Sequence, residues 1–557
     1  SRGLGDVYKR QDIPKTSEVE KLIEHSKEFE RQVLSYETPG GAIHFAIGFG
    51  IANSIMVEGD GGNIIIDASD SVFEAEKIYS LFKEKSSSPI KAIIYTHNHG
   101  DHTFGTAFYI KNQNEKPQII SHEDTDYYVQ RIMGILNPII SERSTRMFGT
   151  LLPEKDLINV GIGPSLNVAK SPTGYIKPDL TFKDDLKINI AGINIELFHA
   201  PGETNDQIFV WLPNHKALMP GDNIYKTFPN LYTIRGTTHR DVKGWVESID
   251  HMQTFNAEYL FPSHTKPIIG KDQIDEVLTT YRDAIQYIHD QTIRLMNQGL
   301  YPDEIAEIIK LPDNLANSPY LYEFYGTVRW SVKSIFNGYL GWFSGNPSEL
   351  DPLSRKERAL RISKLAGGDE MLLKQLYTAV DNKDMQWALE LSDHLIVLDY
   401  FTVEVKQLRK EALIYEGSRS PNPNKRNYLL TSALELDESF ENTVLIERTD
   451  ELLEQVSIHT LFDVLSVRFN PESYNNDYFL ACFNFSSGVI KNITIRNKVA
   501  VVTNSKQQSC DLNITSDEIE FKKILVGLQS PITAIASGKI EVEGDPTEFL
   551  KFLSIFR

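Results

Sequence analysis

The sequence predicts a mixed α/β protein of three domains: a layered α/β domain, an all-α domain and a compact α+β domain. A chain of 557 residues is too long for one hydrophobic core, because cores usually stop growing near roughly 250–300 residues. Strand-like apolar runs fill its first part, amphipathic helices its middle, and alternating strands its end. We place the three domains at residues 1–275, 276–441 and 442–557.

The first domain is predicted to alternate strands with helices. Apolar runs of strand length end at Gly- and Pro-marked turns, and helical stretches at Ser71–Lys85 and Asp241–Thr254 interrupt them. This alternation is typical of a layered α/β fold. The predicted strands are Ile43–Ile55, Ile64–Asp67, Ala92–Thr96, Ile119–Ser121, Ile193–His199 and Ile208–Leu212.

The second domain is predicted to be helical. Apolar residues from Ile274 to Ile288 fall at helical spacing, and Glu370–Asp437 shows small and large apolar residues in register. That segment is consistent with tetratricopeptide-like repeats or with ordinary helical hairpins. The third domain is predicted to hold a helix at Leu445–Ile458, then strands, then a final helix at Thr547–Phe556. Its predicted strands are Tyr478–Asn484, Lys491–Arg496, Val499–Thr503 and Cys510–Thr515.

Charge and hydropathy argue against two classes of protein. The net charge of −19 repels the phosphate backbone that a nucleic-acid-binding protein must attract. No apolar run of about 18 residues occurs, so we expect no transmembrane helix and a soluble protein. Ser1 to Gln11 shows no signal-peptide pattern, and the compartment is left open. Cys482 and Cys510 lie in strand-like stretches, where we expect buried free thiols.

Four candidate metal ligands lie within six residues, directly after the predicted strand that ends at Thr96. They are His97, His99, Asp101 and His102. Burying three imidazoles and a carboxylate together is costly unless a partner compensates them, and a divalent cation is the usual partner. Side chains alternate along an extended chain, so the first two can project one way while the last two turn toward a second position.

This H-x-H-x-D-H pattern is similar to the metal motif of the metallo-β-lactamase superfamily. Later segments appear in the superfamily's order: His199-Ala-Pro-Gly-Glu203-Thr, Pro220-Gly-Asp222 and Pro262-Ser-His264. The resemblance implies an αββα sandwich with a dinuclear metal site, and Asp67 as a buried carboxylate that supports it. Taken alone, Glu203 is also consistent with a turn residue, and His264 with a surface imidazole.

The resemblance also implies a ligand set. His97, His99 and Glu203 would hold one metal, Asp101, His102 and His264 the other, and Asp222 would bridge the two. Mixed nitrogen and oxygen ligation suits zinc best, ahead of iron or manganese, so we expect two Zn²⁺ ions per chain. Such a pair activates a water molecule, and Asp101 and Asp222 are the residues to which we assign a catalytic role.

Within the superfamily the chain resembles the alkyl sulfatases. The resemblance rests on Glu203, on Asn230-Leu-Tyr-Thr-Ile-Arg235-Gly, on Tyr325-Gly-Thr-Val and on Tyr339-Leu-Gly-Trp-Phe-Ser-Gly-Asn-Pro347. It implies a catalytic domain, a helical dimerisation domain and a C-terminal sterol-carrier-like α+β domain, and hence a homodimer. The chain departs from the familiar family pattern at Asp222, where Glu is usual, and at Trp330-Ser331, where His-Asn is common. We therefore place it in a divergent branch.

A planar guanidinium matches two oxygens of a sulfate ester, and Arg235 occupies the position of the family's sulfate-binding arginine. Asn230, Tyr232, His239 and Arg240 are weaker candidates for substrate binding, and an ion pair with an acidic residue is the competing role for both arginines. We therefore expect metal-dependent hydrolysis of an alkyl sulfate, a small amphiphile, to an alcohol and inorganic sulfate. The alternatives are hydrolysis of a carbonyl substrate (a lactone, thioester or β-lactam) and a lipid-binding protein with a vestigial metal site.

Overall fold

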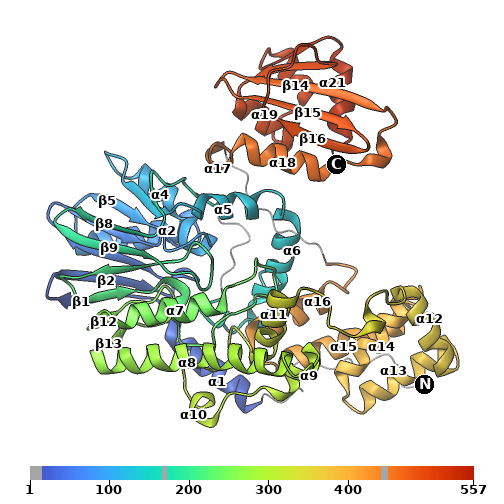
Figure 1. Ribbon diagram of the computed structural model, residues 1–557, viewed down its shortest axis with the longest axis horizontal. Helices are drawn as coiled ribbons and strands as arrows, with labels where there is room; N and C mark the ends of the chain where they lie inside the picture. The colour runs from blue at the N-terminus through green and yellow to red at the C-terminus, as the bar shows by residue number, and fades with distance from the viewer. Residues whose placement is uncertain (1–15, 166–171, 441–449, 557) are drawn as a thin grey trace. The chain divides into compact units, whose positions relative to one another are not determined.

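The computed structural model describes residues 16–165, 172–440 and 450–556, and these divide into two compact units. The first unit contains residues 16–123, 142–165 and 178–440. The second contains residues 124–141, 172–177 and 450–556. Each unit is described below by itself (Figure 1).

A seven-stranded sheet with the order β1-β2-β3-β4-β5-β6-β7 forms the first layer of the first unit. Its first four strands are antiparallel, and β4 to β7 are parallel. Ser71 caps the crossover helix α2 (Val72–Lys85) by accepting a hydrogen bond from the Glu74 backbone N–H. The strands are β1 (Gln32–Thr38), β2 (Gly41–Ile47), β3 (Ser54–Gly59), β4 (Gly62–Ile66), β5 (Ile90–Ile94), β6 (Gln118–His122) and β7 (Leu180–Phe182).

The predicted single strand Ile43–Ile55 is wrong, because the chain turns between β2 and β3. Gly48 has a φ of 79°, which ends the strand, and a Cβ there would lie 2.3 Å from the Phe29 carbonyl oxygen. The turn makes Ile43 the partner of Val57 in an antiparallel pair. An unbroken apolar run does not reveal such a reversal.

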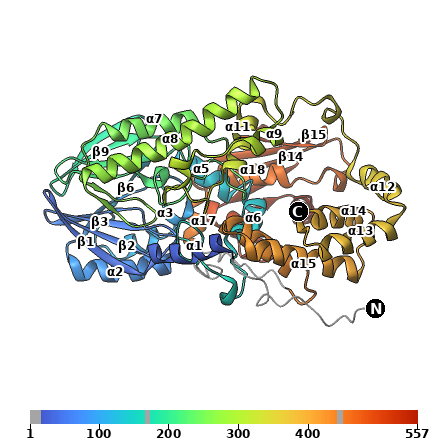
Figure 2. The same ribbon diagram turned by 90° about the horizontal axis from the view of Figure 1, so that it is seen from below.

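A six-stranded sheet with the order β13-β12-β11-β10-β9-β8 forms the second layer. Buried side chains of both sheets share one apolar core, which includes Ile55, Ile94, Leu197 and Val210. The helices α7 (Val242–Gln253) and α8 (Lys271–Met296) lie side by side over the second sheet (Figure 2). The strands are β8 (Asp185–Ile190), β9 (Ile193–His199), β10 (Ile208–Leu212), β11 (Ala217–Met219), β12 (Tyr259–Leu260) and β13 (Ile268–Ile269).

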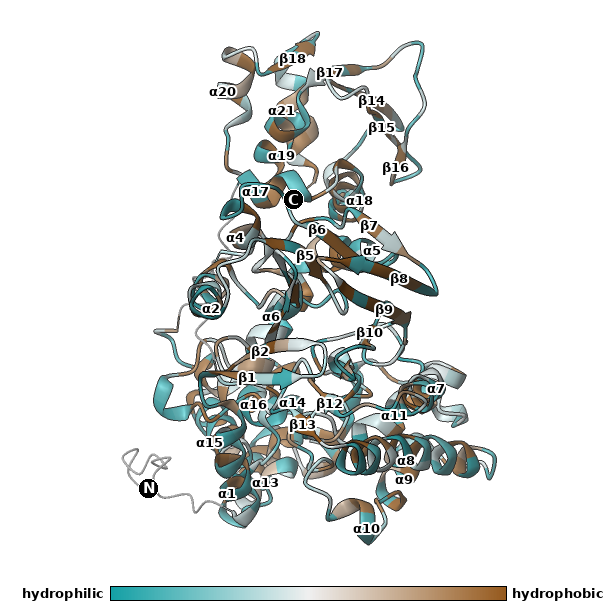
Figure 3. Ribbon diagram, turned by 90° about the vertical axis from the view of Figure 1, so that its left-hand side faces the viewer, coloured by the Kyte–Doolittle hydropathy of each residue, from teal (hydrophilic) through white to brown (hydrophobic). Residues whose placement is uncertain are grey.

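These elements form a helix–sheet–sheet–helix sandwich and confirm the predicted layered α/β fold. Figure 3 shows apolar residues concentrated on the strands, whereas α8 has both polar and apolar residues. The predicted boundary after residue 275 falls inside α8, and this boundary stays a prediction. The remaining helices of this part are α1 (Ser17–His25), α3 (Gly100–Thr103), α4 (Thr106–Lys111) and the C-terminal half of α6 (Asn137–Phe148).

The helical part of the first unit confirms the predicted all-α region. Its helices α13 to α16 form successive hairpins, in which each helix packs on the next. Leu372, Leu376, Ala388 and Leu395 make up part of their shared core. The helices are α9 (Pro302–Ile308), α10 (Asp313–Ala316), α11 (Val328–Leu340), α12 (Arg355–Ala366), α13 (Asp369–Asp381), α14 (Met385–Val397), α15 (Val403–Arg419) and α16 (Pro423–Leu434).

The segment before α11 packs against the loop that follows β11. Phe228 N–H donates to the Tyr322 carbonyl oxygen at 2.8 Å, and Gly326 N–H donates to the Phe228 carbonyl oxygen at 3.1 Å. A Cβ at Gly326 would lie 2.0 Å from the Pro229 carbonyl oxygen, so only glycine fits. The helical region therefore fixes the backbone of the loop that begins the predicted substrate segment.

The second unit consists of the predicted α+β region together with α5 (Thr125–Met133). Its five-stranded sheet has the order β16-β15-β14-β17-β18, and an aromatic core that includes Phe462, Phe483 and Phe521 packs against it. Gln130 of α5 donates to the Gln455 carbonyl oxygen at 2.8 Å. The elements are α17 (Asp450–Gln455), α18 (Ile458–Arg468), β14 (Tyr478–Phe485), β15 (Ile490–Arg496), β16 (Val499–Thr503), β17 (Leu512–Ser516), α19 (Glu518–Leu525), α20 (Pro531–Ala536), β18 (Ile540–Glu543) and α21 (Pro546–Ser554).

Two predictions for this unit need correction. The predicted helix Leu445–Ile458 begins outside the described residues, and its described part ends at Gln455, because Ser457 starts a new helix by capping the Thr460 N–H at 3.0 Å. The predicted free thiols Cys482 and Cys510 form a disulfide instead. The parallel pairing of β14 with β17 brings the Cα atoms of Cys482 and Cys510 to within 6.0 Å of each other.

In the described residues, no helix combines the length and the apolar character that crossing a bilayer requires.

Candidate metal centre

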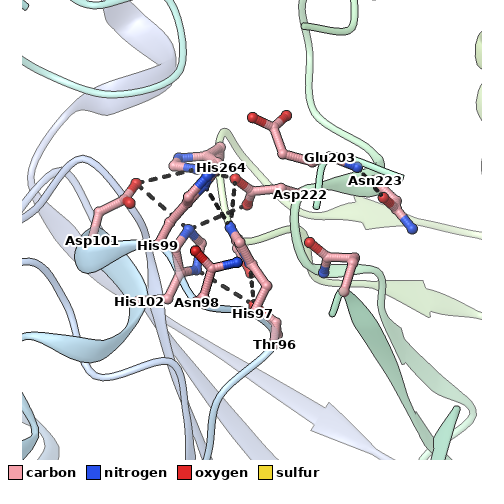
Figure 4. A network of polar contacts seen from close by, with 12 residues as sticks. Thr96, His97, Asn98, His99, Asp101, His102, Glu203, Asp222, Asn223 and His264 are labelled. Carbon is pink, nitrogen blue, oxygen red and sulfur yellow. Dashed lines mark hydrogen bonds and ion pairs between the residues drawn. The ribbon is translucent and has the colours of Figure 1, made fainter. Parts of the chain in front are cut away.

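The four residues of the H-x-H-x-D-H segment lie where β5 ends and the short helix α3 begins. The structure gathers them with Asp222 and His264 into two groups of possible ligands, and in each group the ligand atoms lie within 4.8 Å of one another. The first group is His97, His99 and Asp222, and the second is Asp101, His102 and His264. Figure 4 shows both groups converging from the two sheets.

Asp222 lies between the two groups. Its Oδ2 atom is 3.5 Å from His97 Nε2 and 3.1 Å from His264 Nε2, and its Oδ1 atom is 3.4 Å from His102 Nε2. Burial raises the pKa of this carboxyl, but the imidazoles of His264, His102 and His97 outweigh burial and hold the pKa well below its usual value. The lowered pKa favours the ionised carboxylate, which is the form that binds a cation.

The imidazoles of the first group are held neutral. Burial, aided by repulsion from His102, lowers the pKa of His97 to about 4. Burial and the nearby His97 and Arg235 lower the pKa of His99 well below its usual value. A neutral ring nitrogen is the form that binds a metal.

Asp67 orients the second group through hydrogen bonds to its carboxylate. Its carboxylate accepts hydrogen bonds from His102 Nδ1 at 2.7 Å and from the Ser263 hydroxyl at 2.7 Å, and Oδ1 accepts the Thr96 backbone N–H at 2.9 Å. The remaining nitrogen of the His102 ring, Nε2, points into the group. His264 is oriented in the same way, because its Nδ1 bonds the Ile51 carbonyl oxygen at 2.9 Å.

The donor set fits divalent metal ions. Among the described residues, His102 Nε2 and Asp222 Oδ1 are buried without a hydrogen-bond partner, although polar atoms rarely remain so. Both atoms face the other ligands, and imidazole nitrogens with carboxylate oxygens suit zinc or a similar ion. Among the candidate ligand carboxylates Asp101, Asp222 and Glu203, Asp101 is the most exposed, with 20% of its side chain accessible.

Glu203 lies outside both groups. Its Oε1 atom is 2.8 Å from Arg240 Nη1, and its Oε2 atom accepts a hydrogen bond from the Tyr225 hydroxyl at 2.9 Å. Only 1% of Glu203 is exposed. Its predicted role as a ligand stays a prediction, and it is compatible with these contacts because a carboxylate has about four lone-pair sites.

Of the predicted substrate residues, Arg235 contacts the first group directly. Arg235 donates to His99 Nε2 at 3.0 Å and to the Thr233 hydroxyl at 3.1 Å, and Asn230 and Arg240 are fully buried. His239 is exposed and lies against Gly338 of α11. A Cβ added at Gly338 would lie 2.0 Å from the His239 ring. Tyr232 is half-buried.

Comparison with known proteins shows the family. Three family models match the chain: the metallo-β-lactamase superfamily at residues 47–264, alkyl sulfatase dimerisation at residues 301–439 and alkyl sulfatase C-terminal at residues 447–557. A linear primary-alkylsulfatase of Pseudomonas sp. is 34% identical over 90% of this chain and 98% of its own length. This chain belongs to the alkyl sulfatase family.

Other alkyl sulfatases match over the same extent. An alkyl/aryl-sulfatase of Saccharomyces cerevisiae is 26% identical over 91% of this chain and 80% of its own length. The solved structure of a stereoselective inverting sec-alkylsulfatase from Pseudomonas sp. aligns with a TM-score of 0.89 at 23% identity, over 98% of this chain and 88% of the other. This structural likeness supports the succession of sandwich, helical and C-terminal α+β regions.

Tyr225 is a residue of this alkyl sulfatase's site that no sequence pattern indicates. It lies three residues after Asp222, is 1% exposed, and bonds both Glu203 and the backbone of Asn230. A single tyrosine is usually a packing residue, and the segment Asn223-Ile-Tyr225-Lys-Thr carries no motif that indicates otherwise.

Proposed function

We propose that this chain hydrolyses alkyl sulfate esters to an alcohol and inorganic sulfate. The observation that carries the proposal is the match to a linear primary-alkylsulfatase over 90% of this chain. The site supports it, because Asn230 and Arg240 hold buried polar atoms that have no hydrogen-bond partner among the described residues, and a sulfate ester offers acceptor oxygens to such donors.

We propose that His97, His99 and Glu203 hold one Zn²⁺ and Asp101, His102 and His264 a second, with Asp222 between them. Bound there, the ions would lower the pKa of a water molecule and neutralise charge that develops on the ester. Asp222 would keep the groups together as their shared carboxylate. Asp101, the most exposed ligand carboxylate, would face the arriving substrate and orient the attacking water.

Arg235 is proposed as the main sulfate ligand. Its guanidinium already reaches His99, so its second edge can bind two sulfate oxygens while the side chain stays fixed by Thr233 and by the Phe148 ring, 6.0 Å away. The buried amide of Asn230 would bind a further oxygen. Tyr232, His239 and Arg240 are proposed as secondary substrate residues.

We also propose that the chain forms a homodimer through its helical region. The dimerisation model matches residues 301–439, and the same range exposes large apolar side chains. Leu365 is 88% exposed and Trp342 is 73% exposed, which is unusual for a surface that faces only water.

A product analysis tests the proposed function. Zinc-loaded protein is given decyl sulfate, and inorganic sulfate and decanol are measured beside the hydrolysis of a lactone, a thioester and a β-lactam. Sulfate and decanol released in equal amounts, with slower hydrolysis of all three carbonyl substrates, is the expected result. Rapid hydrolysis of a carbonyl substrate alone would support the alternative, and protein that retains no metal would support a lipid-binding role.

A further inference from the structure

Four buried residues form a closed ring of polar contacts beside the metal groups. The Tyr225 hydroxyl donates to Glu203 Oε2 at 2.9 Å and accepts the Asn230 backbone N–H at 2.9 Å. Arg240 Nη1 lies 2.8 Å from Glu203 Oε1 and also donates to the Asn230 carbonyl oxygen. Glu203 and Asn230 are thus joined twice, once through Tyr225 and once through Arg240.

The ring is shielded from bulk solvent. Glu203, Tyr225 and Arg240 are each 1% exposed, and Asn230 is fully buried. Polar contacts removed from water are strong, and a buried polar group that loses its partner cannot turn to solvent instead. Each contact of the ring therefore restricts the residues that it joins.

Three aromatic rings hold Tyr225 in place. His264, Tyr281 and Tyr325 each pack edge-on against it, with ring centroids 6.0 Å away and interplanar angles of 82° to 83°. Tyr281 comes from α8, and Tyr325 from the segment before α11. The hydroxyl position is therefore set by packing, independently of its hydrogen bonds.

The ring fixes the backbone of Asn230 and leaves its side chain free. Both atoms of its amide, Nδ2 and Oδ1, are buried without a hydrogen-bond partner in the described part of the chain. The same holds for Arg240 Nε and Nη2. Buried donors and acceptors without partners are rare, and a cluster of them beside ligand atoms indicates that a polar ligand completes it.

We propose that Tyr225 is a positioning residue that ties Glu203 to Asn230 and so sets the metal group and the sulfate-binding amide in fixed relation. The inference rests on the proposed function, which gives Glu203 to a metal and Asn230 to the sulfate. The Tyr225 hydroxyl then positions both the metal ligand and the sulfate-binding residue, because it donates to the Glu203 carboxylate and accepts from the Asn230 backbone N–H at the same time.

The substitution Tyr225→Phe tests this link, because it removes the hydroxyl and keeps the ring that His264, Tyr281 and Tyr325 hold. The control is Tyr175→Phe, which also removes a buried hydroxyl that donates to a carboxylate, that of Asp126 at 3.0 Å, in the second unit. Two quantities are measured on each protein: the chelator concentration at which half the zinc is lost, and kcat and KM for decyl sulfate.

For Tyr225→Phe we expect zinc to be lost at a roughly tenfold lower chelator concentration, as is usual when a ligand loses its supporting contact. KM should rise about tenfold with a smaller change in kcat, since Asn230 binds the substrate. Tyr175→Phe should change neither quantity. A Tyr225→Phe protein with a lower melting temperature but unchanged zinc retention and KM would overturn the proposal. A change in zinc retention alone, or in KM alone, would overturn it as well.

The zinc measurement does not depend on the reaction. If the parent protein hydrolyses no alkyl sulfate, the proposed function fails, and zinc retention still decides whether Tyr225 acts on Glu203. Unchanged zinc retention would then overturn the link by itself.

Discussion

At the scale of single residues, we predict that Arg235 decides between a sulfate ester and a carbonyl substrate. Lysine at this position would keep the positive charge and lose the planar pair of donors that matches two sulfate oxygens. We expect Arg235→Lys to lower kcat/KM for decyl sulfate on the order of 100-fold, equivalent to about 2.7 kcal/mol, at unchanged zinc content. Steady-state kinetics with metal analysis checks this, and a variant with parental kcat/KM would remove Arg235 from sulfate recognition.

We predict that His25 makes the first unit sensitive to acid. Its ring is buried against Phe324, with Nε2 bonded to the Gly161 carbonyl oxygen at 2.8 Å, and burial lowers its pKa below the usual value of 6.5. A histidine with a lowered pKa in the folded state gives stability that is present above pH 6.5 and is lost as the pH falls toward the folded-state value. His25→Gln keeps a donor and cannot be protonated.

The parent protein should therefore lose more melting temperature between pH 7.5 and pH 5.5 than His25→Gln does. Thermal unfolding of both proteins at the two pH values measures the difference. Equal losses would show that His25 is not a source of the acid sensitivity, whatever the other histidines contribute.

At the scale of elements, the disulfide between Cys482 and Cys510 cross-links the C-terminal sheet. Cys482 lies in β14 and Cys510 just before β17, and the bond closes a loop of 28 residues. Loop closure of this length stabilises a fold by about 3–4 kcal/mol, mainly by restricting the unfolded chain. Cys482→Ser with Cys510→Ser should lower the unfolding midpoint of the second unit, measured by calorimetry.

The same variant should leave zinc retention unchanged, because the disulfide and the metal groups lie in different units. A parent protein in which thiol titration finds two free cysteines after unfolding without reductant would contradict the pairing.

Elements were predictable where their signal is local. Helices α2 and α7 and strands β9 and β10 carry clear periodicity and lie where the sequence indicates. The reversal at Gly48 and the break before Ser457 depend on single turn residues inside apolar stretches, and the disulfide depends on the register between β14 and β17. A turn set by one residue and a disulfide set by strand register both leave the apolar periodicity unchanged, so periodicity does not reveal them.

In the candidate site too, residues with a local sequence signal were predictable and residues without one were not. The four candidate ligands of the H-x-H-x-D-H segment lie close together in sequence, so their density alone indicates a metal. Asp222, His264 and Arg235 were found through the family resemblance. Tyr225 was not predicted, and the ion pair of Arg240 was expected only as a competing role, without Glu203 as its partner, because these contacts join residues that are distant in sequence.

At the scale of the whole molecule, substrate recognition must be local. A net charge of −19 repels an anionic ester at long range, and salt screens that repulsion beyond roughly 10 Å. Arg235 and Arg240 supply positive charge directly at the metal groups. The sandwich positions the ligands, and the helical region fixes the substrate loop through Tyr322 and Gly326.

The most direct test of a dinuclear alkyl sulfatase is a zinc titration of metal-stripped protein, with bound zinc and sulfate release from decyl sulfate measured together. We predict that release rises as each chain takes up a second zinc ion, and that Asp222→Ala, which removes the shared carboxylate, abolishes it. Full sulfate release without bound metal, or none from protein that holds two zinc ions per chain, would contradict the account.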